Sequence, residues 1–318
     1  MSDAYQIQPT ATTQEQSVET ASSRSAVRSQ PKGNLGGILL SLFALYIIWG
    51  STYLGMRFAL ESFPPFLMAG IRFVIAGTIL YTFLRVRGVA TPTRAQILGS
   101  TIIGILLLAG GTGGVSFAEQ WVSSGLAAVG IVVVPLWAAL FIGLMGRWPR
   151  RIEWFGLGLG FVGVIFLNLE NGVWANPIGA IALLLAPLCW ALGSALSSRV
   201  PQSLGLMASA TQMLTGGIFL LALGLALGER IRSVPTASAI WAMLFLIFFG
   251  SLIAFTAYGY LLRNVRPALA TSYAYVNPAV AVGLGVLFAG EHITLIGVLA
   301  MVIILAGVGL VSLGREHK

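Results

Sequence analysis

The sequence predicts an all-α polytopic membrane protein whose ten transmembrane helices form two inverted five-helix repeats. Three observations lead to this prediction: an apolar composition, a series of apolar segments of membrane-spanning length, and a repeat of motifs along the chain. Of the 318 residues, 57% are hydrophobic and only 9% are charged, and the mean hydropathy is +0.90. About 25% of the residues of a soluble domain are charged, so this chain could not cover its surface in water.

Ten segments are apolar enough to cross the hydrocarbon core, which takes about 20 residues of helix. Clusters of polar and turn-forming residues separate them, and the connections are short, which predicts one bundle without a soluble domain. The predicted spans are 35–58, 65–86, 96–117, 123–145, 152–169, 177–198, 204–227, 238–262, 267–289 and 293–314.

Basic residues in the connections predict how the bundle lies in the membrane. One side would carry Arg24, Arg28, Lys32, Arg85, Arg87, Arg94, Arg147, Arg150, Arg151, Arg199, Arg263, Arg266, Arg315 and Lys318. The other side would carry only Arg230 and Arg232. Since Lys and Arg accumulate in cytoplasmic loops, both termini are predicted to be cytoplasmic, in a multi-pass protein of the inner (plasma) membrane.

Three regions follow from this pattern. Residues 1–34 are rich in Gln, Ser, Thr and Ala and lack an apolar run of signal-peptide length, which predicts a disordered cytoplasmic tail. The first five-helix repeat is expected over 35–170 and the second over 174–314.

The repeat is visible as matching residues. Shifting the chain by 143 residues places Pro135 on Pro278. The same shift places Gly36, Gly50 and Ser51 on Gly179, Gly193 and Ser194. Two similar halves with an odd number of spans must cross the bilayer in opposite directions. Such inverted repeats are typical of secondary transporters, which bind their substrate near the midplane between the halves.

Pro135 and Pro278 fall inside predicted spans four and nine, where proline removes a backbone donor and bends a helix. A membrane helix tolerates this when neighbouring helices or polar side chains bond the freed carbonyl. The pair is therefore a candidate hinge for alternating access. Packing kinks without a role in movement are an equal alternative.

The sequence gives little support for a metal site, a cofactor or a nucleic-acid partner. Cys189 is the single cysteine, and the two histidines, His292 and His317, lie near segment or chain ends. No cofactor or metal is expected from so few ligands. The formal charge of +8 is explained by cytoplasmic loops rather than by nucleic acid.

The chain lacks residues that several classes of enzyme and pump require. Both lysines, Lys32 and Lys318, lie in the termini, which excludes a phosphate-binding loop. Asp3 is the single aspartate, so a paired-aspartate membrane protease is excluded. The chain is therefore predicted not to be an enzyme.

Polar and aromatic side chains inside the predicted spans are costly, so each needs a partner or a watery cavity. Many lie at helical spacing on one face, which predicts one aromatic, weakly polar central cavity. The candidate substrate-binding residues are Tyr46, Trp49, Tyr53, Arg72, Thr112, Ser116, Glu119, Trp190, Ser194, Thr256, Tyr260, Tyr273 and Asn277. For any single Ser or Thr the alternative is a bond to the carbonyl one turn back in its own helix. The glycine-rich stretch 110–114 is expected to let another helix backbone come close.

Arg72 lies about two turns inside the second predicted span, with no carboxylate in its own helix. A buried arginine needs a partner. Glu119 is at comparable depth, so the expectation is an Arg72–Glu119 pair or a shared water network. The alternative is that Arg72 bonds helix-end carbonyls while Glu119 faces the outer solution.

Two stretches carry a family resemblance. PALATSYAYVNPAVAVGLGVLFAGEHITLIGVLAMVIILAGVGLV at 267–311 resembles the second repeat of EamA-type drug/metabolite transporters. FALYIIWGSTYLGMRFALESFPPFLMAGIRFVIAG at 43–77 resembles the start of the first repeat, and both look most similar to the YedA-like inner-membrane exporters. An acidic residue near the end of each repeat's fourth span is usual in this family. It is present as Glu291, whereas the first repeat has Trp148-Pro149.

The resemblance implies a ten-helix fold and transport of small organic molecules. With the aromatic cavity, it predicts a secondary transporter that exports small amphipathic or aromatic metabolites by alternating access. A channel-like facilitator of small solutes is the alternative, and a lipid-modifying membrane enzyme is a weaker one. The expected partners are a small-molecule substrate and the lipid bilayer. Whether the chain forms a homodimer is left open.

Overall fold

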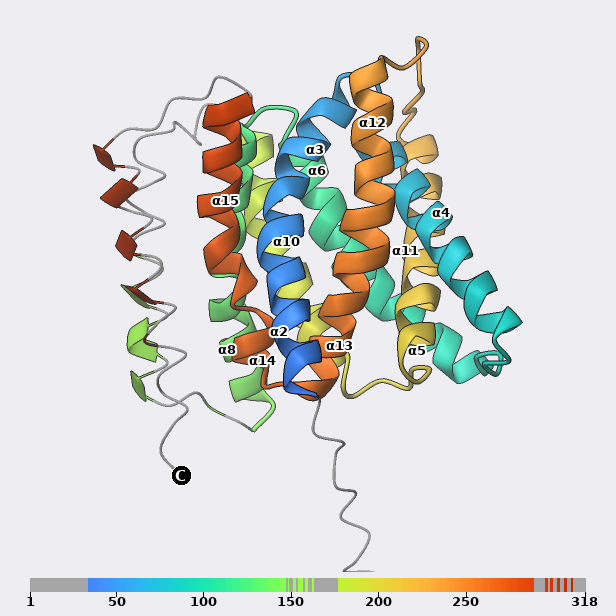
Figure 1. Cartoon of the computed structure of the whole chain (residues 1–318), viewed down its shortest axis with the longest axis horizontal. Helices are drawn as coiled ribbons and strands as arrows, with labels where there is room; N and C mark the ends of the chain where they lie inside the picture. Colours follow the sequence, from blue (N-terminus) through green and yellow to red (C-terminus); the bar gives the residue numbers. More distant parts are fainter. Residues whose placement is uncertain are drawn as a thin grey trace, which may run out of the picture.

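The computed structural model describes residues 34–146, 148 and 177–288, with isolated positions between 151 and 162 and between 295 and 310. Every regular element in this described part is helical (Figure 1), which confirms the all-α class. Nearly all of the predicted tail, Glu291, and most of the predicted spans 152–169 and 293–314 lie outside the described residues.

The helices follow one another with short connections. In chain order they are α2 (Leu35–Ala44), η1 (Leu45–Trp49), α3 (Gly50–Leu60), α4 (Pro65–Val86), α5 (Arg94–Gly104), η2 (Ile105–Gly113), α6 (Gly114–Ala118), α7 (Ser124–Gly130), η3 (Ile131–Val133), α8 (Val134–Leu144), α10 (Pro177–Leu196), α11 (Leu206–Ala226), α12 (Ala237–Phe245), η5 (Leu246–Phe255), α13 (Thr256–Asn264), α14 (Pro267–Ala270) and α15 (Tyr273–Phe288).

Six of these stretches are long and apolar enough to cross a membrane. They are Leu35–Leu60, Pro65–Val86, Arg94–Ala118, Pro177–Leu196, Leu206–Ala226 and Ala237–Asn264. Two shorter apolar helices, Ile131–Leu144 and Tyr273–Phe288, lie where spans four and nine were predicted. These eight match predicted spans one to four and six to nine. Because spans five and ten fall mostly outside the described residues, the count of ten stays a prediction.

Local sequence signals explain several helix starts. Proline is favoured in the first helical turn because its missing N–H has no partner there, and α4 begins with Pro65. At α5, the Thr93 hydroxyl accepts from the backbone N–H of Gln96, 3.3 Å away. The Gln96 side chain in turn accepts from the backbone N–H of Thr93 at 2.9 Å, which completes a capping box.

Three of the long spans change to π-helix at mid-length. The stretches are η1 in Leu35–Leu60, η2 in Arg94–Ala118 and η5 in Ala237–Asn264. A π-helix hydrogen-bonds from i to i+5, so it widens the helix and shifts the face that later residues present. These stretches were not predicted from the sequence, and residues of all three line the central cavity described below.

The helices α4 and α11 pack against each other through four glycines. A Cβ atom added to Gly77 would lie 2.8 Å from the backbone nitrogen of Leu214, and one added to Gly217 would lie 2.8 Å from that of Val74. A Cβ atom added to Gly70 would lie 2.9 Å from the backbone nitrogen of Leu221, whereas one added to Gly224 would meet side chains, with Oε2 of Glu229 at 2.8 Å and Cδ2 of Leu67 at 3.2 Å. Later residues of α4 face earlier residues of α11, so the two helices are antiparallel. We call the contact made by Gly70, Gly77, Gly217 and Gly224 the glycine contact.

A second close approach brings α10 against η2 and α6. A Cβ atom added to Gly111 would lie 2.5 Å from Cε3 of Trp190, and one added to Gly110 would lie 2.6 Å from Cβ of Cys189. Gly114 faces Ala186 at 3.0 Å. The expectation that the glycines at 110–114 admit another helix is therefore confirmed.

Polar contacts join the connections at the upper end of the bundle in Figure 1. The Glu229 carboxylate, after α11, accepts from the backbone N–H groups of Phe66 at 3.2 Å and Leu67 at 2.8 Å. These are free donors of the first turn of α4, and an anion at a helix N-terminus is favourable. Nearby, the backbone N–H of Thr236 donates to the Ser62 hydroxyl at 3.1 Å.

Both candidate hinge prolines follow a break in helical geometry, although the breaks differ. Pro135 lies in the first turn of α8, directly after the short 3-10 helix η3. Pro278 lies inside α15, and the chain turns earlier, at Thr271 and Ser272. The structure thus places irregular backbone before each proline but at unequal distances from it. A hinge role stays a prediction.

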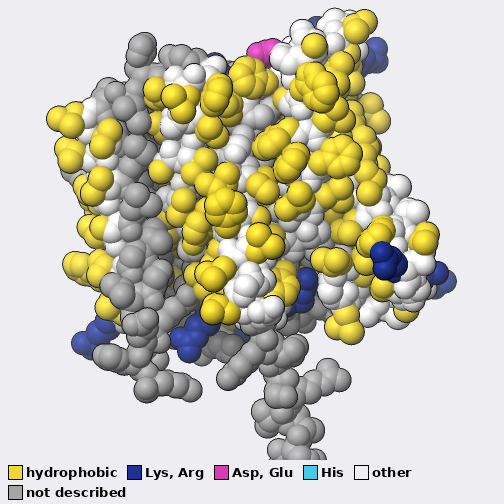
Figure 2. Space-filling view, in the orientation of Figure 1, with side chains coloured by type: hydrophobic (Ala, Val, Ile, Leu, Met, Phe, Trp, Pro, Cys, Tyr) yellow, Lys and Arg dark blue, Asp and Glu magenta, His cyan; other side chains and the backbone are white. Residues whose placement is uncertain are grey.

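Hydrophobic side chains cover the middle of the face shown in Figure 2, while most of the visible Lys and Arg side chains lie towards its lower end. This distribution agrees with a bundle surrounded by lipid. Which end faces the cytoplasm stays a prediction, as does the position of both termini.

Candidate functional site

A cavity lies in the centre of the bundle, where the three π-helical stretches meet. The space between its lining atoms, together with the part open to solvent, amounts to about 530 Å³. Its lining residues are Trp49, Thr52, Tyr53, Met56, Arg72, Phe73, Gly111, Thr112, Val115, Ile131, Trp190, Gly250, Phe255, Tyr273 and Asn277.

The irregular backbone around the cavity is bonded by side chains from other helices. The indole Nε1 of Trp49 donates to the carbonyl of Gly250 in η5, at 3.0 Å. With its nitrogen turned to the surrounding carbonyls, the Asn277 amide donates to Leu45 and Tyr46 in η1, both at 3.2 Å. It also donates to the carbonyl of Tyr273 in its own helix, at 3.1 Å. Irregular backbone persists inside a membrane protein when such partners satisfy it.

Aromatic rings from both halves of the chain form one wall of the cavity. The Trp49 ring lies 4.8 Å from that of Tyr273 and 5.4 Å from that of Trp190, both in edge-to-face geometry. Tyr258 lies beside them, 5.2 Å from Trp49. Edge-to-face pairs at such distances are favourable and hold rings in defined positions.

Tyr258 also closes a ring of hydrogen bonds behind this wall. The indole of Trp190 donates to the Tyr258 hydroxyl at 3.2 Å, and Ser194 Oγ donates to the carbonyl of Trp190 at 2.7 Å. The hydroxyls of Ser194 and Tyr258 are 2.6 Å apart. Because Ser194 uses its proton on the carbonyl, Tyr258 is the donor to Ser194.

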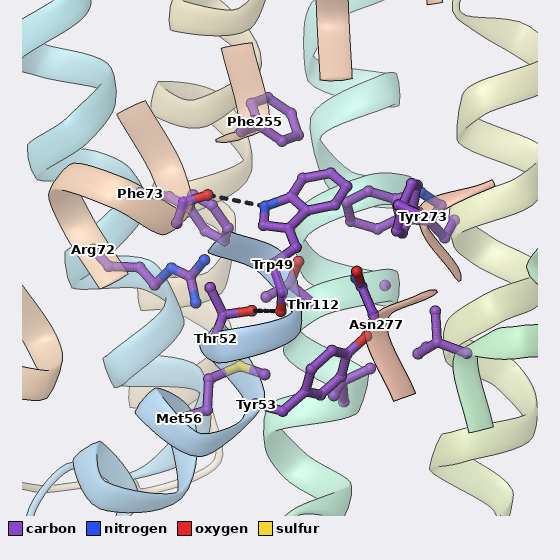
Figure 3. A pocket seen from close by; sticks show the side chains of 15 residues that line it. Trp49, Thr52, Tyr53, Met56, Arg72, Phe73, Thr112, Phe255, Tyr273 and Asn277 are labelled. Carbon is purple, nitrogen blue, oxygen red and sulfur yellow. Dashed lines mark hydrogen bonds between the residues drawn. The ribbon is translucent and has the colours of Figure 1, made fainter. Parts of the chain in front are cut away.

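Arg72 enters the cavity from α4 and is 3% exposed. Its Nε donates to the Ser251 hydroxyl at 3.1 Å, and its guanidinium carbon lies 4.6 Å from the centre of the Phe73 ring. Figure 3 shows the guanidinium pointing towards Thr52 and Trp49.

Glu119 is 5% exposed and interacts electrostatically with Arg72 and Tyr53. Among the described residues, the partner bonded to the Arg72 side chain is Ser251, and no direct ion pair joins Arg72 to Glu119. The two charges therefore interact electrostatically without a direct pair, and a shared water network stays a prediction.

Seven of the thirteen candidate residues line the cavity: Trp49, Tyr53, Arg72, Thr112, Trp190, Tyr273 and Asn277. Four others lie buried or partly buried near it without lining it: Tyr46, Ser116, Glu119 and Ser194. The Tyr46 hydroxyl bonds that of Ser272 at 2.8 Å, and the Ser116 hydroxyl donates to the sulfur of Met56 at 3.3 Å.

Thr256 and Tyr260 lie elsewhere. They line an apolar groove with Leu40, Phe83 and Leu206, while the Thr256 hydroxyl donates to the carbonyls of Leu252 and Ile253 in its own helix. The reason is η5, whose wider turn shifts the register of the helix that follows. Spacing counted at 3.6 residues per turn therefore selected the wrong face of α13.

The same shift brings in residues that the sequence analysis did not name. Gly250 and Phe255 line the cavity, Ser251 holds Arg72, and Tyr258 is 1% exposed behind the aromatic wall. The pair Gly250-Ser251 inside an otherwise apolar stretch was the available sequence signal. The described residues contain no group of three or more His, Cys, Asp or Glu that could hold a metal ion.

The model of the EamA-like transporter family matches the chain twice, at residues 35–169 and 177–313. The chain belongs to this family. The two matches nearly coincide with the two repeats recognised in the sequence. The protein is therefore a membrane transporter with a two-repeat fold.

Several relatives are similar to the chain over most of its length. An uncharacterized inner membrane transporter, YedA of Escherichia coli strain K12, is 47% identical over 276 residues, covering 86% of this chain and 90% of YedA. An uncharacterized transporter, YoaV of Bacillus subtilis strain 168, is 23% identical over 85% of this chain and 95% of its own length. Protein PecM of Dickeya dadantii strain 3937 is 26% identical over 87% of this chain and 95% of its own length.

A solved crystal structure of another protein has the same fold. It superposes with a TM-score of 0.70 over 88% of this chain and 99% of its own, at 21% sequence identity. The likeness extends along nearly the whole of that chain, so it supports the arrangement of the helices, although identity is too low to transfer a substrate.

Proposed function

We propose that this transporter is a secondary carrier that exports small amphipathic or aromatic metabolites by alternating access. In this proposal ten spans form two inverted repeats, and both termini lie in the cytoplasm. The observation that carries the proposal is the aromatic cavity, whose walls come from both family repeats. Trp49, Arg72 and Thr112 come from the first repeat, and Trp190 and Asn277 come from the second.

A site between two repeats suits a carrier because relative movement of the repeats can expose it to one side at a time. The Trp49–Trp190 contact at 5.4 Å crosses from one repeat to the other, so separation of the repeats would open the cavity. The helix breaks before Pro135 and Pro278 are the proposed hinges for this movement. The solute would be held by ring stacking and by a few polar groups.

Reconstituted vesicles provide the test. We expect uptake of a preferred aromatic solute to saturate with concentration and to accelerate when the same solute is loaded on the opposite side. Trp49→Ala and Trp190→Ala should slow this uptake, because both remove cavity wall. Trp148→Ala is a matched control, since Trp148 is exposed and packs on Gly143 away from the cavity. Uptake that rises linearly without acceleration from the opposite side would instead support a channel-like facilitator.

A reporter fused after Lys318 tests the proposed orientation. Reporter activity only on the cytoplasmic side is expected. Activity only outside the cell would reject the proposed topology.

A further inference from the structure

We propose that the cavity binds the carboxylate group of an amphipathic solute and that Arg72 is the residue that holds it. This inference rests on the transport function proposed above and narrows its substrate class to monocarboxylates with an apolar body.

The guanidinium of Arg72 is only partly used by the protein. Arginine has five N–H donors and no acceptor. Nε is bonded to Ser251, whereas Nη1 is buried and has no hydrogen-bond partner among the described residues. A buried donor without a partner costs free energy, and a charged one costs more. A ligand in the cavity could supply the missing acceptor.

The neighbours of Arg72 fix the direction in which these donors point. The Ser251 hydroxyl holds Nε on one side, and the guanidinium lies over the Phe73 ring at 4.6 Å. A Cβ atom added to Gly250 would lie 3.3 Å from Nη2 and 2.9 Å from Cγ2 of Thr52, so glycine leaves room there for the guanidinium. The nitrogens Nη1 and Nη2 are thus presented towards the cavity (Figure 3).

The charges around the cavity favour a single negative group. Arg72 is the one charged side chain among the described lining residues. Its planar fork matches the two oxygens of a carboxylate. Glu119 interacts with Arg72 from outside the lining and partly offsets its charge. A dianionic phosphate would therefore have only one cation in the described lining to balance its two negative charges, whereas a monocarboxylate needs only one.

The remainder of the lining suits an apolar body on the same molecule. The rings of Trp49 and Tyr273 meet edge to face at 4.8 Å, and Trp190 and Ile131 add further apolar surface. A carboxylate at Arg72 would leave its apolar body against this wall.

Binding to the purified full-length protein in detergent tests the proposal without a transport assay. The probes are benzoate, phenylacetate and hydrocinnamate, each compared with its neutral amide of the same shape. The readouts are the dissociation constant from tryptophan fluorescence and the shift of the thermal unfolding midpoint. We expect at least one acid to bind about tenfold more tightly than its amide, as a charge-assisted hydrogen bond would provide.

Variants assign the preference to Arg72. In Arg72→Gln the acid and its amide should bind equally, and Arg72→Lys should retain only part of the preference because lysine lacks the fork. Ser251→Ala should weaken the preference by releasing Nε. The matched control is Arg87→Gln, since Arg87 lies directly after α4 and also stacks on a phenylalanine ring, Phe83, but is exposed. It should keep the full preference.

Several results would overturn the inference. One is that no acid binds more tightly than its amide to the unmodified protein. Another is that folded Arg72→Gln prefers the acid over the amide as strongly as the unmodified protein does. If Arg72→Gln does not fold, an unchanged preference in both Arg72→Lys and Ser251→Ala has the same meaning. Saturable uptake of neutral aromatic solutes without any acid preference would reject this inference and leave the transport proposal standing. Acid binding that depends on Arg72, without uptake of any solute, would support this inference and reject the transport proposal.

Discussion

The two halves of the chain meet in two regions that differ in backbone and chemistry. At the glycine contact, α4 and α11 are unbroken helices whose backbones approach until a single Cβ atom would lie 2.8 Å from a backbone nitrogen. Around the cavity, three spans are π-helical, and side chains of Trp49 and Asn277 bond the carbonyls of neighbouring helices.

The difference separates a rigid contact from an adaptable one. Where two helix backbones touch, no side chain can change rotamer to accommodate a movement. The contact is therefore either kept whole or broken. Hydrogen bonds from side chains to irregular backbone can exchange partners when the helices move. We therefore expect the glycine contact to hold the repeats together, and the cavity region to be where they can move. Four substitutions test this contrast.

Substitution within the glycine contact should have the largest effect. In Gly217→Leu the new side chain would meet the backbone of Val74, and we expect a loss of at least about 3 kcal/mol or failure to fold, as for severe overpacking. The control is Gly283→Leu, because a Cβ atom at Gly283 meets no heavy atom within 4 Å. Yield of monodisperse protein and the thermal unfolding midpoint are the measurements. Equal behaviour of the two variants would contradict the assigned role.

Asn277→Leu should have the second largest effect, because it removes the donor to the carbonyls of Leu45, Tyr46 and Tyr273. The amide shares two N–H donors among these three carbonyls, so about 0.6 kcal/mol for each donor, together with the cost of leaving buried carbonyls without a partner, predicts a loss of about 2 kcal/mol. Asn264→Leu is the matched control, since the bond that its side chain makes among the described residues is to the Tyr260 carbonyl in its own helix, at 2.8 Å. Thermal unfolding in detergent should rank them in this order, and the reverse order would show that η1 does not depend on Asn277.

Tyr258→Phe keeps the ring of the aromatic wall and removes the hydroxyl that bonds Trp190 and Ser194. Two lost bonds predict about 1 kcal/mol of destabilisation. Tyr260→Phe serves as the control, because Tyr260 lies in the outer groove rather than beside the cavity. A midpoint for Tyr258→Phe that matches the control would exclude a structural role for the hydrogen-bonded ring.

Thr256→Val should have the smallest effect, within about 0.5 kcal/mol. Within the described part of the chain the Thr256 hydroxyl bonds carbonyls of its own helix, and its side chain faces the outer groove. Unfolding and binding of the aromatic acids should both match the unmodified protein. A marked loss of binding would mean that α13 is turned towards the cavity.

The all-helical class and eight of the expected spans were predictable because apolar length and clustered glycines have a direct physical meaning, whereas the orientation expected from the basic connections stays a prediction. Gly110, Gly111 and Gly114 illustrate this, since the structure packs α10 against them as expected. The cavity was partly predictable for a similar reason. Trp49, Arg72, Trp190 and Asn277 are costly inside a membrane, so their presence indicated a shared polar region.

The remaining features depend on spacing that the sequence does not reveal. A π-helix has no local residue code, and after η5 it is Tyr258 that packs against Trp49, while Thr256 and Tyr260 line the outer groove. The Arg72–Glu119 prediction failed as a direct pair for a related reason. The sequence indicates how deep a residue lies along its helix in the membrane. It does not indicate how far apart two helices lie in the membrane plane.

The contact between Trp49 and Trp190 gives the molecule an optical property of its own. Two indoles 5.4 Å apart at an interplanar angle of 82° couple their electronic transitions, and one belongs to each repeat. Such coupling appears as a paired band in circular dichroism and decays steeply as chromophores move apart. The circular dichroism of the unlabelled protein therefore depends on the distance between the two indoles across its cavity. The difference spectrum between the unmodified chain and Trp190→Phe would isolate that band, and its loss on adding a solute would report separation of the halves.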